Sequence, residues 1–511
     1  MIRPTTLLRL GLAGTRTDTV RIVLTAAASS LATLTFLAAA TVIAVPTVSD
    51  DRSNRSPQYG PALLAEAGLR PGVAITLFLL AIPVLALAGQ CARLGAPARN
   101  RRLAAIRLAG GTPGQVRALA ATETGLASTL GAGVGLAGYL VGRWLLHRPD
   151  ANGLLPLPTD VLPPAWALLL IVAGIPLLAT GVAAVLLRGV VVSPFGVRRS
   201  GRVGRPGWWP GILILGGLAI AFVFRPLLDW TVGQGMPLWT VALLGFVGAL
   251  AVAIGVATGT GWISHVSGQL LHRVARRPAT LLAARRLTAD PWHGARTFAA
   301  LLVCVLFGAG TAGYRAYMAT EFSSWEGVER LLAEQSGQPY HPSDNSFYFN
   351  AVTLVNIAVL VGLTIAAAGL AVAVAESVVE RRRANAALVA TGVPRGVLAR
   401  SVLVQTLTPL LPATLVALAA GTMLVRALGT EVSSGSRTTG YCEPADACRT
   451  PEDWERYARF IEHPGVTLAV PVPLDDLALL GAGAVLAALA TVGIGLLFLR
   501  GATDVTELRA S

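Results

Sequence analysis

Long apolar stretches divide this chain and limit what it can fold into. Ten of them approach or exceed the length of about 20 residues that crosses a hydrocarbon core as a helix. Because a backbone in lipid must satisfy its own hydrogen bonds, such stretches form helices. We therefore predict an all-α polytopic membrane protein with ten transmembrane helices, near 22–46, 72–92, 122–146, 163–187, 209–228, 237–258, 297–317, 350–375, 403–428 and 472–499.

The composition agrees with a membrane protein. Only 13% of the residues are charged and 54% are hydrophobic, whereas soluble domains carry about 25% charged residues. The net charge is +14, but the arginines lie in short loops between apolar stretches, which argues against nucleic acid as a partner. The first apolar run is longer than a signal-peptide core of about 7–15 residues, so we expect an uncleaved first span.

The arginines also indicate an orientation. All 41 basic residues are Arg. If both termini lie inside, the cytoplasmic segments hold 28 of them and the external segments 13. Loops rich in Arg are retained in the cytoplasm. We therefore expect a multi-pass protein of the plasma membrane with both termini cytoplasmic.

A short basic segment occurs twice, between apolar stretches. Arg102, Gly111 and Pro113 align with their counterparts 281 residues later, at Arg383, Gly392 and Pro394. A second match pairs 3–8 with 277–282, and both segments are expected to begin interfacial amphipathic helices. The order of the matches predicts a parallel repeat. The expected domains are a first repeat at 1–208, a linker hairpin at 209–275 and a second repeat at 276–511.

Each copy of the basic segment is expected to form an elbow of helix, tight turn and helix. Gly favours a helix C-terminus, and Thr-Pro favours a helix start. Ordinary solvated hairpins would look similar, but duplication at equivalent positions favours a docking role. The first elbow, 101–113, and the second elbow, 382–394, supply the candidate docking residues Arg101, Arg102, Arg107, Gly110, Gly111, Thr112, Pro113, Arg382, Arg383, Gly392, Val393 and Pro394.

Nucleotide and metal chemistry find no support in the sequence. A P-loop needs a Lys to reach the nucleotide phosphates, and this chain has no Lys. No His residues have the spacing of a metal site. The Gly-rich pattern at 133–138 lies inside a span, where small residues favour close helix packing. We expect no cofactor, metal or catalytic residue in this chain.

The first elbow resembles a known family motif. The segment 101–116, together with Glu123 and the tail at 193–199, is similar to FtsX-like ABC transporter permeases of the MacB/LolC/BceB group. The resemblance implies a non-catalytic permease that docks two copies of a P-loop ATPase, which would bind the ATP and Mg. Two features depart from the family: Ala104 and Asn385 stand where it has Glu, and the loops at 47–71 and 318–349 are short.

Three further features carry expectations. Glu123, at the membrane edge of a span, is either a functional acid or a residue favoured by the helix dipole. Cys442 and Cys448 are expected to form a disulfide outside the cell, with two free thiols as the alternative. The loop 429–471 is expected to hold a short helix at 451–460, which contacts an external or membrane partner or packs as a lid.

The predicted function is export, or extraction from the membrane, of a hydrophobic or amphipathic substrate. One alternative is mechanotransmission, as in antibiotic sensing or resistance without bulk transport. An ion-coupled secondary transporter is the alternative from another class. It needs ionisable residues midway through the spans, and the span centres hold almost none.

Overall fold

The structure is a computed structural model. It describes residues 16–46, 56–67, scattered positions from 69 to 84, 108, 110, 112–186, 207–233, 238–336, 339–340, 342, 345–380, 382–435, 437–442, 458–463 and 465–502.

The fold is predominantly helical, with 81% of the described residues in helices. Four short strands break the expected all-α pattern. The helices are α2 (Arg16–Ala44), α3 (Ala62–Ala65), α6 (Pro113–Leu146), α7 (Ala165–Leu186), α8 (Trp209–Gly233), α9 (Leu238–Val274), α10 (Pro278–Ala289), α11 (Pro291–Ser336), α12 (Ser346–Glu380), α13 (Arg382–Ala390), α14 (Arg395–Arg426) and α16 (Leu474–Ala502); the strands are β1 (Glu431–Ser433), β2 (Arg437–Cys442), β3 (Ala458–His463) and β4 (Thr467–Ala469).

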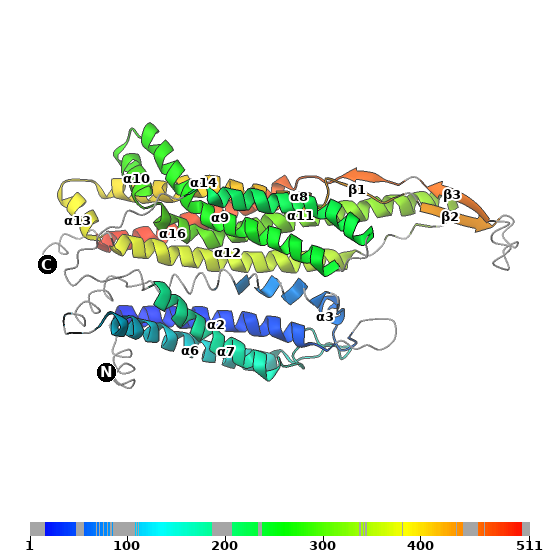
Figure 1. Ribbon diagram of the computed structural model, residues 1–511, viewed down its shortest axis with the longest axis horizontal. Coiled ribbons are helices and arrows are strands. Elements are labelled where there is room, and N and C mark those ends of the chain that lie inside the picture. Colours follow the sequence, from blue (N-terminus) through cyan, green and yellow to red (C-terminus); the bar gives the residue numbers. More distant parts are fainter. Residues whose placement is uncertain are drawn as a thin grey trace.

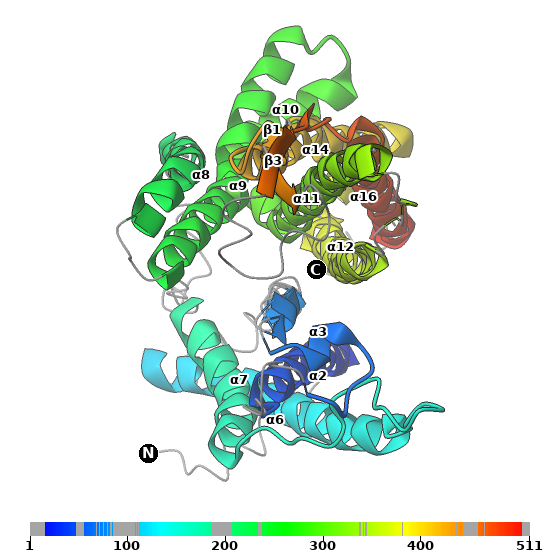
Figure 2. The same cartoon turned by 90° about the vertical axis from the view of Figure 1, so that its right-hand side faces the viewer.

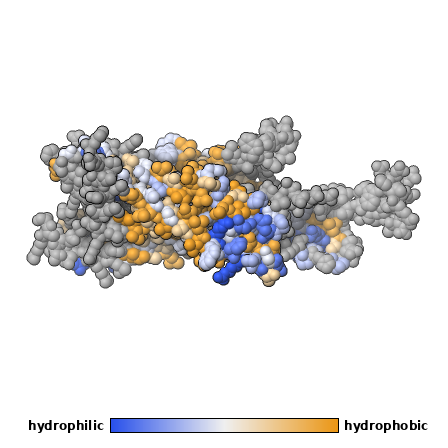
Figure 3. Space-filling view, turned by 90° about the horizontal axis from the view of Figure 1, so that it is seen from below, coloured by the Kyte–Doolittle hydropathy of each residue, from blue (hydrophilic) through white to orange (hydrophobic). Residues whose placement is uncertain are grey.

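Seven helices in the described part of the chain are long and apolar enough to cross a membrane. They lie in α2, α6, α9, α11, α12, α14 and α16. Two further predicted spans correspond to shorter apolar helices, at Ala165–Gly181 and Trp209–Val223, and the span predicted at 72–92 is described only at scattered positions. Figure 3 shows the hydrophobic band on one face of the molecule. The chain is therefore a multi-pass membrane protein.

The helices form two bundles, which Figures 1 and 2 show one above the other. In the first bundle, α2, α6 and α7 pack against one another. A Cβ added at Gly135 would lie 2.7 Å from the carbonyl oxygen of Ser30, so α6 crosses α2 closely. Ser29 and Ser128 share a hydrogen bond of 2.9 Å across this crossing. Close approach and interhelical hydrogen bonds are what hold helices together in lipid.

The second bundle is built around α11, which contacts α9, α12, α14 and α16. Its core includes Leu301, Val305 and Leu306 from α11, with Leu370 from α12 and Leu410 from α14. The predicted linker hairpin, α8 and α9, also belongs to this bundle, because α9 packs along α11 and α14. A small cluster joins the two bundles, where Ile365 of α12 lies against Ala32, Val84 and Ile175.

Corresponding helices pack in the same pairs in the two bundles. The α2–α6, α6–α7 and α2–α7 contacts match those of α11–α14, α14–α16 and α11–α16. The first helices of these pairs, α2 and α11, begin at the end of the molecule that carries α10 and α13. We call this the elbow end, and the opposite end, with the strands, the ribbon end (Figure 1). The parallel repeat itself stays a prediction.

The ribbon end differs from the sequence prediction. α11 continues to Ser336, so its 46 residues span about 69 Å at 1.5 Å per residue, more than a membrane requires. The segment after α14 forms antiparallel ribbons, β1 with β4 and β2 with β3. The helix expected at 451–460 is wrong at its C-terminal end, because Phe460 pairs in β3. The spacing of the aromatic residues favoured a helix only weakly. At Phe460 the backbone instead pairs with β2 in an antiparallel ribbon.

A buried arginine organises the ribbon end of the first bundle. Arg70 is 4% exposed and donates to the carbonyl oxygens of Leu64 at 2.7 Å and Val45 at 2.9 Å, and to the Ser56 hydroxyl at 2.6 Å. The two carbonyls lie at the C-terminal ends of α3 and α2, where helical carbonyls have no partner of their own. Nearby, burial and a hydrogen bond to Asp160 raise the pKa of Tyr59 to about 12.

Candidate functional site

The second elbow has a well-defined turn. α13 ends at Ala390, and Gly392 adopts φ 92°, a conformation that favours glycine. The Gly392 amide donates to the carbonyl of Val389 at 2.9 Å, and the Val393 amide donates to that of Leu388 at 3.0 Å. This pair of hydrogen bonds is the Schellman motif of helix C-termini. α14 then begins at Arg395, so the expected order of helix, turn and helix is present.

Apolar packing fixes this elbow to the second bundle. Val393 lies in a cluster with Leu388 of α13 and Leu398 of α14. The same cluster contains one residue each from α10, α12 and α16: Leu282, Val378 and Leu496. The second elbow therefore contacts helices on three sides, and its position depends on all of them.

A polar contact also joins the second elbow to α10. Asn385 is 3% exposed, and its side-chain oxygen accepts a hydrogen bond from Arg286 of α10 at 3.2 Å. α10 buries Ala279, Ala283, Ala284 and Leu287 along one face, as an amphipathic helix would. Asn385 stands where the resembling family has Glu. Its role as the acceptor for Arg286 depends on a tertiary contact that no sequence spacing reveals.

One face of α13 remains open. Ala384, Ala387 and Ala390 are exposed, as is Thr391 just beyond the helix. These positions recur every three or four residues and so lie on one side of the helix. The opposite side carries Asn385 and Ala386, which are buried. A small, smooth face of this kind is suited to contact with another protein.

The first elbow is described from its turn onward. Gly110 adopts φ 92°, the same value as Gly392. Thr112 caps α6: its hydroxyl accepts from the Gln115 amide at 3.3 Å, and the Gln115 side chain accepts from the Thr112 amide at 2.9 Å. Such a capping box satisfies two of the free amides at a helix start. Pro113 occupies the first helical position, as predicted.

The described part of the first elbow adds a glycine to the comparison of the two elbows. The sequence alignment paired Gly392 with Gly111, which lies outside the described residues; among the described residues of the first elbow, Gly110 has the left-handed conformation. In both elbows this glycine precedes the first helical residue by three positions, which are Pro113 and Arg395. The prolines therefore differ in place, since Pro113 follows the N-cap and Pro394 is the N-cap. Short motifs fix the turn but not the residue at which the helix begins.

Several predicted residues lie outside the described part of the chain. These are Arg101, Arg102, Arg107, Gly111 and Cys448, together with the side chains of Pro113, Arg382, Arg383 and Cys442. The predicted disulfide therefore stays a prediction. Glu123 lies in α6 and is 6% exposed, far from the ribbon end and ten residues into the helix that follows the first elbow.

A comparison with protein families finds a match in the second bundle. The model of the FtsX-like permease C-terminal domain matches residues 356–503. Over this part, the chain is similar to FtsX-like permeases. The match covers most of α12, the whole second elbow, α14, the strands and α16. Among curated proteins, no match to the chain is found.

The similarity of residues 356–503 to this family gives the second elbow its context. FtsX-like permeases are membrane subunits of ABC transporters, and the family implies partnership with an ATPase subunit. The second elbow is a helical turn inside the matched domain, at the elbow end, with an open face on α13. The matched domain therefore contains a formed candidate contact for such a subunit.

Proposed function

We propose that this FtsX-like permease docks two copies of a P-loop ATPase, one on each elbow, and uses their ATP hydrolysis to move its helices. The observation that carries the proposal is the second elbow, which lies inside the matched family domain and has the same glycine geometry as the first. ATP and Mg would be bound by the partner, because this chain has no Lys for a P-loop.

The proposed orientation places the elbow end in the cytoplasm of the cell and the ribbon end outside, across the plasma membrane. Exposed arginines at the elbow end support it, among them Arg273, Arg276, Arg277 and Arg285. A cysteine introduced at Arg148 should then react with a membrane-impermeant maleimide in whole cells, whereas one at Arg277 should react only after lysis.

The proposed cargo is a hydrophobic or amphipathic molecule that is exported or extracted from the membrane. Support comes from the division into two bundles, which meet, within the described part of the chain, at a small apolar cluster that includes Ile365. An ATPase that closes on two elbows would rotate the bundles against each other. Duplication of the four-helix unit, which the matching helix pairs support, gives each ATPase its own bundle.

A second candidate, mechanotransmission without bulk transport, is favoured by the ribbon end. α11 extends to Ser336, and it contacts β1 and β4 at the ribbon end (Figure 1). A movement of α11 at the elbow end would therefore reach a partner held outside by the segment 429–471. Transport and mechanotransmission share the ATPase and differ in whether the cargo crosses.

The test is a pull-down of the solubilised chain from its native membrane, with the co-purifying subunits identified. Recovery of a P-loop ATPase, and ATP-dependent movement of an amphipathic dye in proteoliposomes, is expected for a transporter. ATPase recovery without dye movement would select mechanotransmission. A chain that purifies alone and shows ATP-independent flux would contradict the proposal and indicate a secondary transporter.

A further inference from the structure

The two bundles differ at one corresponding place, the last turn of the helix that follows each elbow. In the first bundle this turn of α6 carries Arg143. Its guanidinium donates to the carbonyls of Val161 at 2.6 Å and Asp160 at 3.0 Å, which belong to the connector between α6 and α7. Arg143 is therefore used to hold its connector in place.

The corresponding turn of α14 carries Arg426, and here the arrangement is open. Among the residues that the structure describes, the Arg426 side chain forms no hydrogen bond or ion pair, although Glu431, Asp475 and Asp476 follow in the chain. The chain that connects α14 to α16 ends with residues 470–473, which we call the connector of α14. Two of these residues are prolines, which have no backbone N–H to donate. The guanidinium is thus left with its five donors available.

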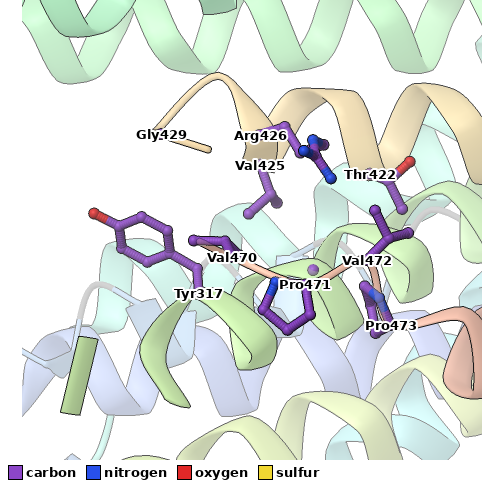
Figure 4. Close-up of a pocket in the computed structure, with 10 residues that line it drawn as sticks. Tyr317, Thr422, Val425, Arg426, Gly429, Val470, Pro471, Val472 and Pro473 are labelled. Carbon is purple, nitrogen blue, oxygen red and sulfur yellow. The ribbon is translucent and has the colours of Figure 1, made fainter. Parts of the chain in front are cut away.

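Arg426 lines a cavity instead. It is a shallow hollow between α11, α14 and the connector: its space free of atoms is about 290 Å³, most of it open to the surroundings, and its inner part has room for about one water molecule. Figure 4 shows Arg426 and Val425 on α14, Tyr317 on α11, and the connector residues Val470 to Pro473 between them. The Thr422 hydroxyl donates to its own helix, at Leu418 and Ala419. The lining is therefore mostly apolar, with one cation.

The position of the cavity points to a ligand from the membrane. Arg426 is the last residue of the candidate span Arg395–Arg426, so the cavity lies where the apolar band meets the ribbon end. Val472, which lines the cavity, is 42% exposed, and Leu474 beside it is 70% exposed. The opening therefore adjoins apolar surface, along which an acyl chain could lie.

We propose that this cavity binds the anionic headgroup of an amphiphile from the leaflet at the ribbon end. Arg426 would pair with the phosphate or carboxylate, since a guanidinium matches the geometry of both anions. Val470, Pro471 and Val472 would contact the carbon atoms next to the headgroup. The site is separate from the elbows, and binding there needs no ATPase, so it can fail or stand independently of the proposed function.

The test uses the purified full chain in nanodiscs of phosphatidylcholine, with fluorescent phosphatidylglycerol as the probe. Arg426→Gln should weaken binding about tenfold, because it removes a charge-assisted pair. Val472→Trp, which fills the cavity from an exposed position, should weaken binding while keeping the charge. Arg148→Gln is the matched control, since Arg148 is an exposed arginine at the ribbon end outside the cavity, and should bind as the unsubstituted chain does.

Three results would overturn the proposal. Unchanged binding by Arg426→Gln would show that the cation is not used. An equal loss in Arg148→Gln would reduce the effect to surface charge. Displacement of the lipid probe by inorganic phosphate at similar concentration would assign the site to a soluble anion, with no part for the acyl chain.

Discussion

The described parts of the two elbows share a turn glycine and differ in the contacts made at the helix start that follows it. Gly110 and Gly392 have the same φ of 92°, and each precedes the start of its helix by three residues. The first elbow is then held by a polar capping box between Thr112 and Gln115. The second has Pro394 at the cap, without a side-chain hydrogen bond, and is held by the apolar cluster around Val393.

This difference separates the shape of an elbow from its attachment. Shape is set locally, by a glycine with positive φ and by the helix start that follows it. Attachment depends on helices distant in the chain, as when α10 contacts Asn385. A force applied to the second elbow would therefore pass directly to α10, α12 and α16, which pack around it.

The largest expected effect concerns the close crossings behind the elbows. A side chain at Gly131 of α6 would collide with the backbone of Ala26, and one at Gly421 of α14 with that of Leu306. Because a backbone cannot move aside, Gly131→Leu and Gly421→Leu should each lower the free energy of unfolding by roughly 3 kcal/mol. SDS titration in mixed micelles would measure this.

Neighbouring glycines provide the controls for the crossings. Added side chains at Gly133 and Gly483 meet nothing within 4 Å, so Gly133→Leu and Gly483→Leu should change the free energy of unfolding by no more than about 0.5 kcal/mol. If only one of Gly131→Leu and Gly421→Leu lowers the free energy of unfolding, the two helix crossings are not equivalent.

Next comes the contact between the second elbow and α10. Arg286→Ala removes the donor of a buried Asn385 and should lower the free energy of unfolding by roughly 2 kcal/mol, the cost of an unsatisfied buried amide and lost packing. The exposed neighbour provides the comparison, since Arg285→Ala should have little effect. In a double-mutant cycle, Asn385→Leu should recover part of the loss; full additivity of the two changes would contradict a direct contact.

A smaller effect should be common to both elbows. Gly110→Ala and Gly392→Ala place a Cβ at positive φ and should each destabilise the chain by about 1 kcal/mol. Gly114→Ala and Gly396→Ala lie four residues further on, inside helices with open space around them, and should stabilise by up to about 1 kcal/mol. Thermal unfolding would measure the change in stability of each variant. If all four substitutions change the stability in the same direction, the shared turn geometry is wrong.

The smallest effect is expected at the first elbow alone. Thr112→Ala breaks the capping box and should lower the free energy of unfolding by about 0.5 to 1 kcal/mol. Thr391→Ala, at an exposed residue of the second elbow whose hydroxyl donates to Leu388, should be nearly neutral. A larger loss at Thr391 than at Thr112 would reverse the proposed division between polar and apolar elbows.

Local signals predicted the local features. Apolar length gave the spans that the structure describes as long helices, and Gly followed by Pro gave the turns of the elbows. The segment beginning at Arg277 predicted a short amphipathic helix, and α10 begins at Pro278. Each of these depends on residues within a few positions of one another, so one sequence suffices.

Features that depend on distant residues could not be predicted in the same way. The continuation of α11 to Ser336 depends on its contacts with β1 and β4, and the strand at Phe460 depends on its partner Gly440. The same holds for Arg286 with Asn385, which are 99 residues apart. Within the described residues, the Arg426 side chain has no hydrogen bond, and this stands out only when α14 is compared with α6, whose Arg143 is hydrogen-bonded.

The central claim, that each elbow docks one ATPase, is tested most directly by stoichiometry. Leu108 is 74% exposed and Ala390 is exposed, and they lie at corresponding places, two residues before the turn glycines. Native mass spectrometry of the purified complex should give two ATPase subunits for the unsubstituted chain, one for Leu108→Asp or Ala390→Asp, and none for the double variant. Two ATPase subunits retained by a folded double variant would contradict the account.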